Sequence, residues 1–313
     1  MSEKPDISII IPTKDREAIF EKTFESAIKA IEGFNIEIII VNDSKEHKVR
    51  LKEDYPNVTI IDNPKNGVAS ARNLGANIAK SDLLLFLDND ILISRNNIIT
   101  TLELYKDNYQ ICYNFNWVYP VKFVGKMKRL QFGRYLDKHN FTSLRGWNKA
   151  DRTVKWDFKR PFEVEMVASF YLPIYKSAFD KVGGFNENFP HSGAENYDFS
   201  KRFKAAGYKI FIHPSSMVYH YEIDRIEIDE WLNRKVREGE TRKVAVEIGY
   251  EELRIAHGSF KRTILKFGIK RKKFFKWILS YIPNNHIYDG IYFKIVNYLL
   301  SVSLYEGFTR KNR

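Results

Sequence analysis

The sequence contains a single cysteine, Cys112, among its 313 residues. One thiol excludes an internal disulfide framework, and no Cys/His spacing typical of a zinc module occurs. We therefore expect a reducing compartment. The polar and acidic start of the chain, Met1 to Asp6, leads directly into an apolar stretch, so we expect no secretory signal. With 44% hydrophobic residues, the chain can bury a large core, which excludes a disordered or fibrous protein.

Long uncharged apolar runs are also scarce. The best candidate for a membrane span is Ile287 to Tyr305, but Asp289, Gly290, Lys294 and Asn297 interrupt it. These residues favour an amphipathic or packed helix over a span. We therefore expect a peripheral protein rather than an integral one.

The formal net charge of +12 is unevenly distributed. From Asn116 to Arg160, twelve Lys/Arg oppose three Asp/Glu, a net +9; from Ser259 to Arg313, twelve oppose two, a net +10. The two segments together carry +19, which exceeds the net charge of the whole chain, so the remaining residues are net acidic. Both basic segments are rich in aromatics, a mixture that suits an anionic lipid surface or anionic polymer as well as nucleic acid.

The first third of the chain alternates between apolar strands and helices. Predicted strands are Ile7 to Thr13, Ile36 to Val41, Val58 to Ile61 and Leu83 to Leu87, and predicted helices are Ala18 to Glu32 and Val68 to Ala79. This alternation predicts an α/β fold with a mostly parallel sheet covered by helices. Polar residues follow the strands, at the edge where such sheets bind ligands.

The pattern changes after Leu104. Residues up to Arg160 are aromatic, basic and weakly periodic, whereas Phe162 to Pro173 has strand character again. Short helices are predicted at Lys176 to Val182 and Ala194 to Ala206, and strands at Tyr208 to Ile212 and Met217 to His220. We expect one domain over 1–225, with a nucleotide-binding half at 1–105 and an acceptor half at 106–225. A basic helical extension would follow over 226–313.

The buried strand at Leu83 to Leu87 ends in Asp88-Asn89-Asp90. Side chains at i and i+2 share a face of an extended chain, so Asp88 and Asp90 can reach one Mg²⁺ or Mn²⁺ ion carrying a diphosphate. On its own the triplet is weak evidence, because acids are common in solvated turns.

Further motifs in the same order give the chain a resemblance to the family 2 glycosyltransferases, which have the GT-A fold, over roughly residues 5 to 222. These motifs are Ile10-Ile11-Pro12-Thr13, Val41-Asn42-Asp43-Ser44, the run Asn66 to Asn73, Asp88-Asn89-Asp90, the run Gly183 to Glu187, and Glu195-Asn196-Tyr197-Asp198 with Arg202. The resemblance implies a Rossmann-like, mostly parallel sheet with helices on both faces. It also implies transfer of a sugar from a nucleotide-sugar donor.

The resemblance implies roles for individual residues. Nucleotide-sugar contacts are expected from Pro12, Thr13, Asp15, Asp43, Asn66, Arg72, Asn73 and Asp88. Thr13 and Asp43 would bind base and ribose, and Arg72 would pin the base-binding acid or a phosphate. Asp88, Asp90 and His220 would hold the Mn²⁺ or Mg²⁺ ion, although a lone histidine is as often structural. Glu187, Trp147 and Trp156 are acceptor candidates, against alternatives of a helix cap or core packing.

The chain departs from the family at the acid motif. Members usually carry Glu-Asp-x-Asp, in which the second acid is taken as the base, but here Asn196 is an amide that cannot accept a proton at neutral pH. The motif also resembles that of the polypeptide N-acetylgalactosaminyltransferases, which retain anomeric configuration. Either Glu195, or less readily Asp198, is the base of an inverting reaction, or Glu195 only binds the donor sugar of a retaining one.

We accordingly predict a metal-dependent transferase, inverting by preference, that uses a UDP-sugar and adds one sugar to a surface glycan or a lipid-linked precursor. It would be cytoplasmic and peripheral at the inner membrane face. A basic amphipathic helix following Ser259 could contact anionic lipid, or equally pack on the catalytic domain. A degenerate nucleotide-sugar or glycan-binding protein is the second possibility. Nucleic-acid binding is disfavoured because it leaves the acids at the strand ends unexplained.

Overall fold

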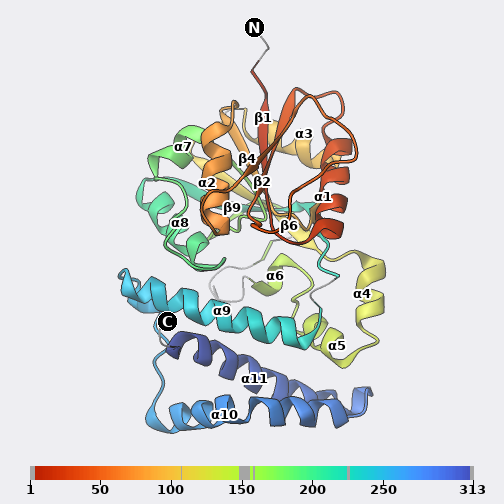
Figure 1. The fold of residues 1–313 in the computed structure, drawn as a ribbon, viewed down its shortest axis with the longest axis vertical. Coiled ribbons are helices and arrows are strands. Elements are labelled where there is room, and N and C mark those ends of the chain that lie inside the picture. The colour runs from red at the N-terminus through yellow and green to blue at the C-terminus, as the bar shows by residue number, and fades with distance from the viewer. Residues whose placement is uncertain (1–3, 107, 148–155, 158, 224–225, 311–313) are drawn as a thin grey trace. The chain divides into compact units, whose positions relative to one another are not determined.

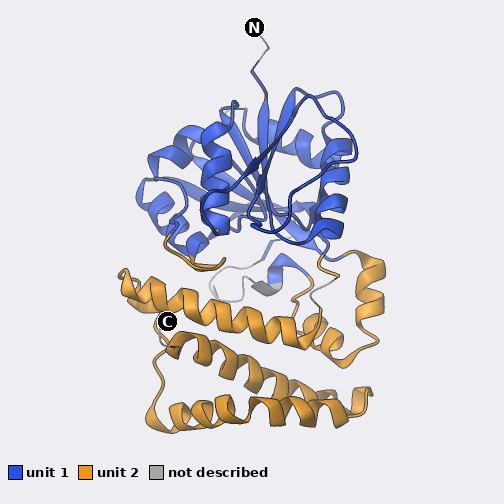
Figure 2. Ribbon diagram, viewed as in Figure 1, with its two compact units in different colours: residues 1–119, 143–187, 195–221 blue, residues 120–142, 188–194, 222–313 orange. Residues whose placement is uncertain are grey.

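The computed structural model describes residues 4–106, 108–147, 156–157, 159–223 and 226–310. The chain forms two compact units that alternate along the sequence (Figure 2). Unit 1 comprises Met1–Tyr119, Ser143–Glu187 and Glu195–Tyr221. Unit 2 comprises Pro120–Thr142, Asn188–Ala194 and Glu222–Arg313.

The main sheet of unit 1 has the strand order β3-β2-β1-β4-β8. Its strands are β1 (Ile7–Thr13), β2 (Ile36–Asn42), β3 (Val58–Asp62), β4 (Leu83–Leu87) and β8 (Tyr171–Tyr175). The first four are parallel, and β8 pairs antiparallel with β4. Strands β1, β2 and β4 are buried at every position, as uninterrupted apolar runs in a parallel sheet predict. Thr13 at the end of β1, Asp43 after β2 and Asp88 after β4 consequently lie at one edge of the sheet.

A second sheet in unit 1 has the order β5-β9-β6, with β7 also paired to β9. Its strands are β5 (Ile91–Leu92), β6 (Ile111–Val118), β7 (Phe162–Glu163) and β9 (Lys209–His220). The sequence predicted two strands where β9 is one, because a bulge opposite Phe115 and Asn116 carries the chain across His213 to Met217. Strand β9 ends at His220, which pairs with Ile91 directly after the acidic triplet.

Helices α1 (Glu17–Ala30), α2 (Val68–Ile78), α3 (Arg95–Leu104), α6 (Leu144–Trp147), α7 (Lys176–Lys181) and α8 (Ala194–Ala205) accompany the sheets of unit 1. Helix α2 packs on β1 and β2. Gly75 permits this approach, because a Cβ there would lie 2.3 Å from Cγ2 of Ile10. The mixed α/β architecture with a mostly parallel sheet is confirmed.

Unit 2 is helical. It contains α4 (Val121–Met127), α5 (Gln131–Lys138), α9 (Ile228–Glu247), α10 (Ser259–Tyr281), α11 (Asp289–Thr309) and short 3₁₀ turns at Glu251–Leu253 and His286–Tyr288. Helix α11 packs against both α9 and α10 (Figure 1). Helix α5 joins them through the Arg134–Asp289 ion pair and a hydrogen bond that the Tyr135 hydroxyl donates to Asn297 Oδ1, at 2.7 Å. None of the described helices has the length and apolarity required to traverse a bilayer.

Candidate functional site

The edge after β1, β2 and β3 is organised around Asp43. Its buried carboxylate accepts hydrogen bonds from Asn63 Nδ2 at 2.7 Å and from the backbone N–H of Gly67 at 3.0 Å. Lys14 Nζ lies 3.8 Å away. Gly67 has φ +111°, a conformation suited to glycine, which lets its N–H reach the acid just before α2. Asn63 was not among the predicted residues, although it too follows a strand end.

The other residues predicted to bind the donor lie at the end of β1, in the loop after it, or in the loop before α2. Thr13 is buried, and its hydroxyl accepts a hydrogen bond from Asn89 Nδ2 at 3.0 Å. Asp15 has φ +50° and accepts from the Ser44 hydroxyl at 2.5 Å. Pro12 is buried within β1, and Asn66 is exposed ahead of α2. Thr13 also lies next to Asp43, because the Asp43 N–H donates to the Thr13 carbonyl at 2.8 Å.

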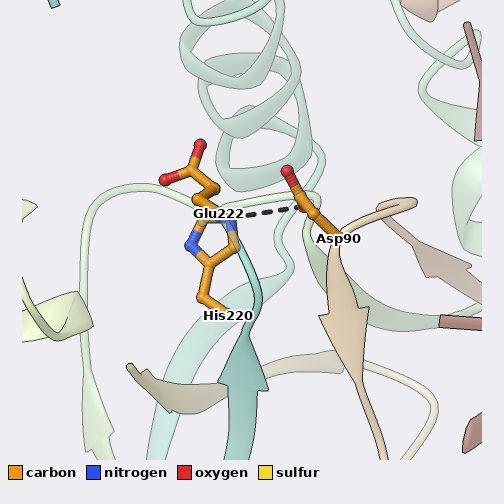
Figure 3. A group of neighbouring side chains, drawn as sticks. All are labelled: Asp90, His220 and Glu222. Atoms are coloured by element: carbon orange, nitrogen blue, oxygen red, sulfur yellow. Dashed lines mark ion pairs between the residues drawn. The ribbon is translucent and has the colours of Figure 1, made fainter. Parts of the chain in front are cut away.

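Asp90, His220 and Glu222 form a buried group whose ligand atoms all lie within 4.8 Å of one another (Figure 3). Asp90 Oδ1 lies 3.2 Å from His220 Nε2. The backbone keeps the two segments together, because Tyr221 N donates to the Asp90 carbonyl at 2.7 Å. The Trp117 and His220 rings pack nearly perpendicular to one another, with centroids 4.7 Å apart. Glu222 was missed from sequence, although it lies two residues beyond a predicted ligand in an alternating segment.

Arg16 also contacts this group. Its Nη1 donates to Asp90 Oδ2 at 2.6 Å and to Asn89 Oδ1 at 3.3 Å. Burial opposes ionisation of Asp90, but His220 and Arg16 outweigh it, so the pKa of this carboxyl lies well below its usual range. Asp90 is therefore ionised in the folded protein, which is the state in which a carboxylate can coordinate a metal ion.

The donor set fits a divalent ion. Two carboxylates and one imidazole are ligands that Mn²⁺ accepts, and the carboxylates suit Mg²⁺. The predicted ligands Asp90 and His220 are brought together. Asp88 is engaged differently, because its Oδ1 accepts from Arg72 Nη2 at 2.7 Å.

Arg72 joins Asp88 to Glu195. The Arg72 side chain is 2% exposed, and its Nη1 lies 3.3 Å from Oε1 of the fully buried Glu195. Its guanidinium also lies over the Phe185 ring, 5.4 Å from the centroid. The partners of Arg72 are therefore Asp88 and Glu195, rather than the base-binding acid that the sequence suggested as one alternative. A buried guanidinium with two carboxylates fixes the position of both.

Asn73 holds the Gly183 to Glu187 segment. Its amide donates to the Phe185 carbonyl at 2.8 Å and to Glu187 Oε1 at 2.9 Å, and its Oδ1 accepts from Phe185 N. Gly184 has φ +65°, and a Cβ there would lie 2.8 Å from Asn73 Oδ1. Lys65 and Asn73 lower the pKa of Glu187 through hydrogen bonds.

Helix α8 carries the rest of the acid motif. Asp198 Oδ2 accepts two hydrogen bonds from Arg202, at 2.6 and 3.0 Å, and Arg202 also donates to the Gly184 carbonyl at 2.8 Å. Arg202, which is held by Asp198, therefore joins α8 to the turn at Gly184. Among the described residues, no hydrogen-bond partner is found for the buried Oδ1 of Asn196.

The structure says less about the two tryptophans that the sequence suggested as acceptor contacts. Trp147 ends α6, and its side chain lies outside the described part of the chain. Trp156 is half-buried and packs edge-on against Phe162, with centroids 5.1 Å apart.

Two family models match the chain. Glycosyl transferase family 2 matches residues 8–183, and the N-terminal domain of galactosyltransferase matches residues 153–225. A chondroitin synthase from Pasteurella multocida is 24% identical over 254 residues, covering 69% of this chain but 25% of that protein. An uncharacterized glycosyltransferase from Haemophilus influenzae is 35% identical over 119 residues, 37% of this chain and 39% of that protein.

Solved structures share the fold. The mannosyltransferase PcManGT from Pyrobaculum calidifontis, in complex with GDP-Man and Mn²⁺, has a TM-score of 0.57 and 12% identity, covering 99% of this chain and 89% of that one. GalNAc-T7 with UDP, GalNAc and Mn²⁺ has a TM-score of 0.51 and 18% identity over 70% of this chain and 44% of that one. The chain therefore has the GT-A fold.

Proposed function

Because the chain belongs to glycosyl transferase family 2, we propose that it is a metal-dependent enzyme that transfers a sugar from a nucleotide-sugar to an acceptor hydroxyl. The observation that carries this proposal is the buried Asp90–His220–Glu222 group at the strand edge. Nearby, Arg72 contacts both Asp88 and Glu195. A nucleotide-sugar transferase needs both a cation site and a fixed acid.

The donor proposed here is a UDP-sugar. Asp43 and the loop after β1 would hold the base and ribose, with Thr13 and Asp15 beside them. Asp90 and His220, with Glu222, would hold Mn²⁺ or Mg²⁺, which when bound neutralises charge on the leaving diphosphate. The fixed position of Asp88 beside Arg72 suits a hydrogen bond to ribose or to a water of the ion. The GalNAc-T7 complex, which contains UDP and Mn²⁺, supports this choice of donor.

Glu195 is the base in the inverting reaction that we favour. The acceptor hydroxyl would pass its proton to the Glu195 carboxylate while its oxygen bonds to the anomeric carbon and the bond to the diphosphate oxygen breaks. Asp198 suits this task less, because Arg202 donates two hydrogen bonds to it at 2.6 and 3.0 Å, both shorter than the 3.3 Å contact between Arg72 and Glu195. In the retaining alternative, Glu195 holds the donor sugar and removes no proton.

The acceptor proposed is a growing surface glycan or its lipid-linked precursor. Similarity to a chondroitin synthase supports a glycan acceptor, and Glu187 and Trp156 are the acceptor contacts we would test first. We place the protein in the cytoplasm, at the inner face of the membrane, where such precursors are assembled.

The test is a screen for nucleotide-sugars that stabilise the protein, followed by an assay for hydrolysis of the donor that does so. A bound donor should raise the unfolding temperature only when Mn²⁺ or Mg²⁺ is present, and the matching donor should be slowly hydrolysed. Stabilisation by a donor without any hydrolysis or transfer would instead favour a nucleotide-sugar-binding protein, the function suggested by the amide at Asn196. If no nucleotide-sugar stabilises the protein in the presence of metal, the proposal is wrong.

A further inference from the structure

Helix α10 (Ser259–Tyr281) exposes a row of large apolar side chains. Successive members are three, four or, in one case, seven residues apart, so they share one face of the helix. The row consists of Phe260, Ile264, Phe267, Phe274, Trp277 and Tyr281, with Arg271 at the one polar position between them. Phe260 is 79% exposed and Tyr281 69%. Trp277 stacks on Phe274, with centroids 5.8 Å apart, and lies 4.7 Å from the Tyr281 ring.

The opposite face of α10 is fixed within unit 2. Leu265 is buried against Val302 and Tyr305 of α11. At Gly268 the helices approach so closely that a Cβ would lie 2.4 Å from Val302 Cγ2. The Tyr298 hydroxyl donates to the Ile264 carbonyl at 3.0 Å. Because these contacts fix the rotation of α10 against α11, the apolar row cannot turn inward without breaking them.

The charge on α10 is of one sign. The helix carries eight Lys/Arg and no Asp/Glu. Two of the lysines are used within unit 2, since Lys272 pairs with Glu306 at 2.9 Å and Lys276 with Asp229 at 2.6 Å. Exposed cations on the remaining surface are Lys261, Arg262, Lys266, Lys270, Arg271 and Lys273. The outward face therefore combines large aromatics with exposed positive charge.

We infer that this outward face of α10 is a docking surface for an anionic lipid bilayer, with the helix lying in the plane of the interface. Aromatic side chains insert at the boundary between headgroups and acyl chains, while Lys and Arg stay with the anionic headgroups. A nucleic-acid groove does not call for an exposed Phe and Ile row, and a protein interface seldom concentrates so many lysines. The inference rests on the peripheral location proposed above and names the surface responsible for it.

The experiment uses the full chain and sedimentation with vesicles. Without donor or metal, the wild-type protein should bind vesicles of phosphatidylcholine mixed with phosphatidylglycerol, should not bind pure phosphatidylcholine, and should dissociate as salt is raised. The readout is independent of sugar transfer, so failure here and failure of the proposed enzyme are distinguishable. Equal binding to both vesicle types, or to neither, overturns the inference.

Two variants separate the contribution of the lysines to vesicle binding from that of the aromatic side chains. Replacing Lys266, Lys270 and Lys273 by Gln should weaken vesicle binding about 100-fold, since each surface cation contributes around fivefold. Replacing Phe267, Phe274 and Trp277 by Ser should abolish it at physiological salt. The matched control replaces three exposed lysines of unit 1, Lys29, Lys45 and Lys106, by Gln. This control changes net charge equally and should bind like wild type; equal weakening in both lysine variants overturns the inference.

A fluorescence experiment tests the same surface without relying on the stability of those variants. Brominated phospholipids should quench part of the tryptophan fluorescence of bound wild-type protein. Trp277→Phe should bind vesicles with near wild-type affinity but lose most of that quenching, because Phe keeps the apolar contact without the indole. Unchanged quenching in Trp277→Phe would place another part of the chain in the bilayer. Dimerisation that the serine variant abolishes, without vesicle binding by wild type, would assign the surface to a second copy of this chain.

Discussion

Arg16 Nη1 lies 2.6 Å from Oδ2 of Asp90, so a guanidinium contacts one oxygen of the carboxylate that we propose as a metal ligand. His220 Nε2 faces the other oxygen at 3.2 Å. A cation that coordinates Asp90 must share or displace these contacts. Arg16 immediately precedes α1 in the loop that follows β1. Once displaced from Asp90, the N–H groups of its guanidinium would be available to bind a phosphate.

Arg16→Ala should therefore have opposite effects on the affinity for the metal ion and on the affinity for the donor. Without metal, the variant should lose about 1–3 kcal/mol of stability, because a buried carboxylate keeps fewer partners. Its affinity for Mn²⁺ alone should rise roughly tenfold, whereas donor affinity should fall. Calorimetric titration with Mn²⁺ measures the former, and Arg50→Ala, at an exposed arginine, is the control. Weaker Mn²⁺ binding in Arg16→Ala would contradict competition between the two cations.

Asp90→Ala should abolish metal-dependent binding of UDP and all turnover while the fold is retained, because the cation loses a buried carboxylate ligand. Thermal unfolding with UDP, with and without Mn²⁺, measures the effect. The assignment fails if wild-type affinity for UDP is unaffected by EDTA.

Glu195→Gln keeps the size of the side chain but removes the carboxylate. If Glu195 is the base, turnover should fall by about 10²–10⁴-fold with donor binding little changed. If it only holds the donor sugar, affinity for the intact donor should weaken more than affinity for UDP. Asn196→Asp distinguishes further, since a degenerate inverting site should gain activity and a site built around the amide should lose it. Near wild-type turnover and donor affinity in Glu195→Gln would refute both roles.

The Arg134–Asp289 pair predicts a pH dependence in unit 2. Arg134 donates from Nε and Nη2 to the two oxygens of Asp289, at 2.8 and 2.7 Å, and this pairing lowers the pKa of Asp289. At pH 7, Asp289→Asn should cost about 1–3 kcal/mol of unfolding free energy.

Because the folded-state pKa of Asp289 is depressed, its contribution is present above the unfolded-state pKa near 4 and is lost as pH falls through the lower folded value. The difference between wild type and variant should shrink in acid, as measured by denaturant unfolding. Glu251→Gln, in the exposed Glu251–Arg254 pair, should have little effect at either pH. An Asp289→Asn difference that is constant with pH would show that the charge is not responsible.

Strand periodicity was sufficient to predict the parallel sheet and the polar edge that follows it, because both depend on local sequence. The resemblance to family 2, rather than any spacing, predicted that Asp90 and His220 belong to one metal site, and the structure brings the two side chains together. Arg16, Asn63 and Glu222 were not found, because their roles depend on contacts with residues distant in sequence. Likewise, no local pattern near Pro120–Thr142 indicates that it packs with α9 and α11; that association depends on Tyr135 and Arg134 finding partners in α11.

Arg72 contacts both Asp88 and Glu195, and this limits how the acid motif on α8 can be exchanged between proteins. Glu195 is neutralised by an arginine 123 positions earlier in the chain, which also contacts Asp88. A chimera that carries this α8 on another scaffold would bury Glu195 without the arginine that contacts it, unless that arginine is transferred as well. Lysine would not replace that arginine, because one ammonium cannot present the same fork to two carboxylates. The unit of recombination for this enzyme is therefore α2 and α8 together.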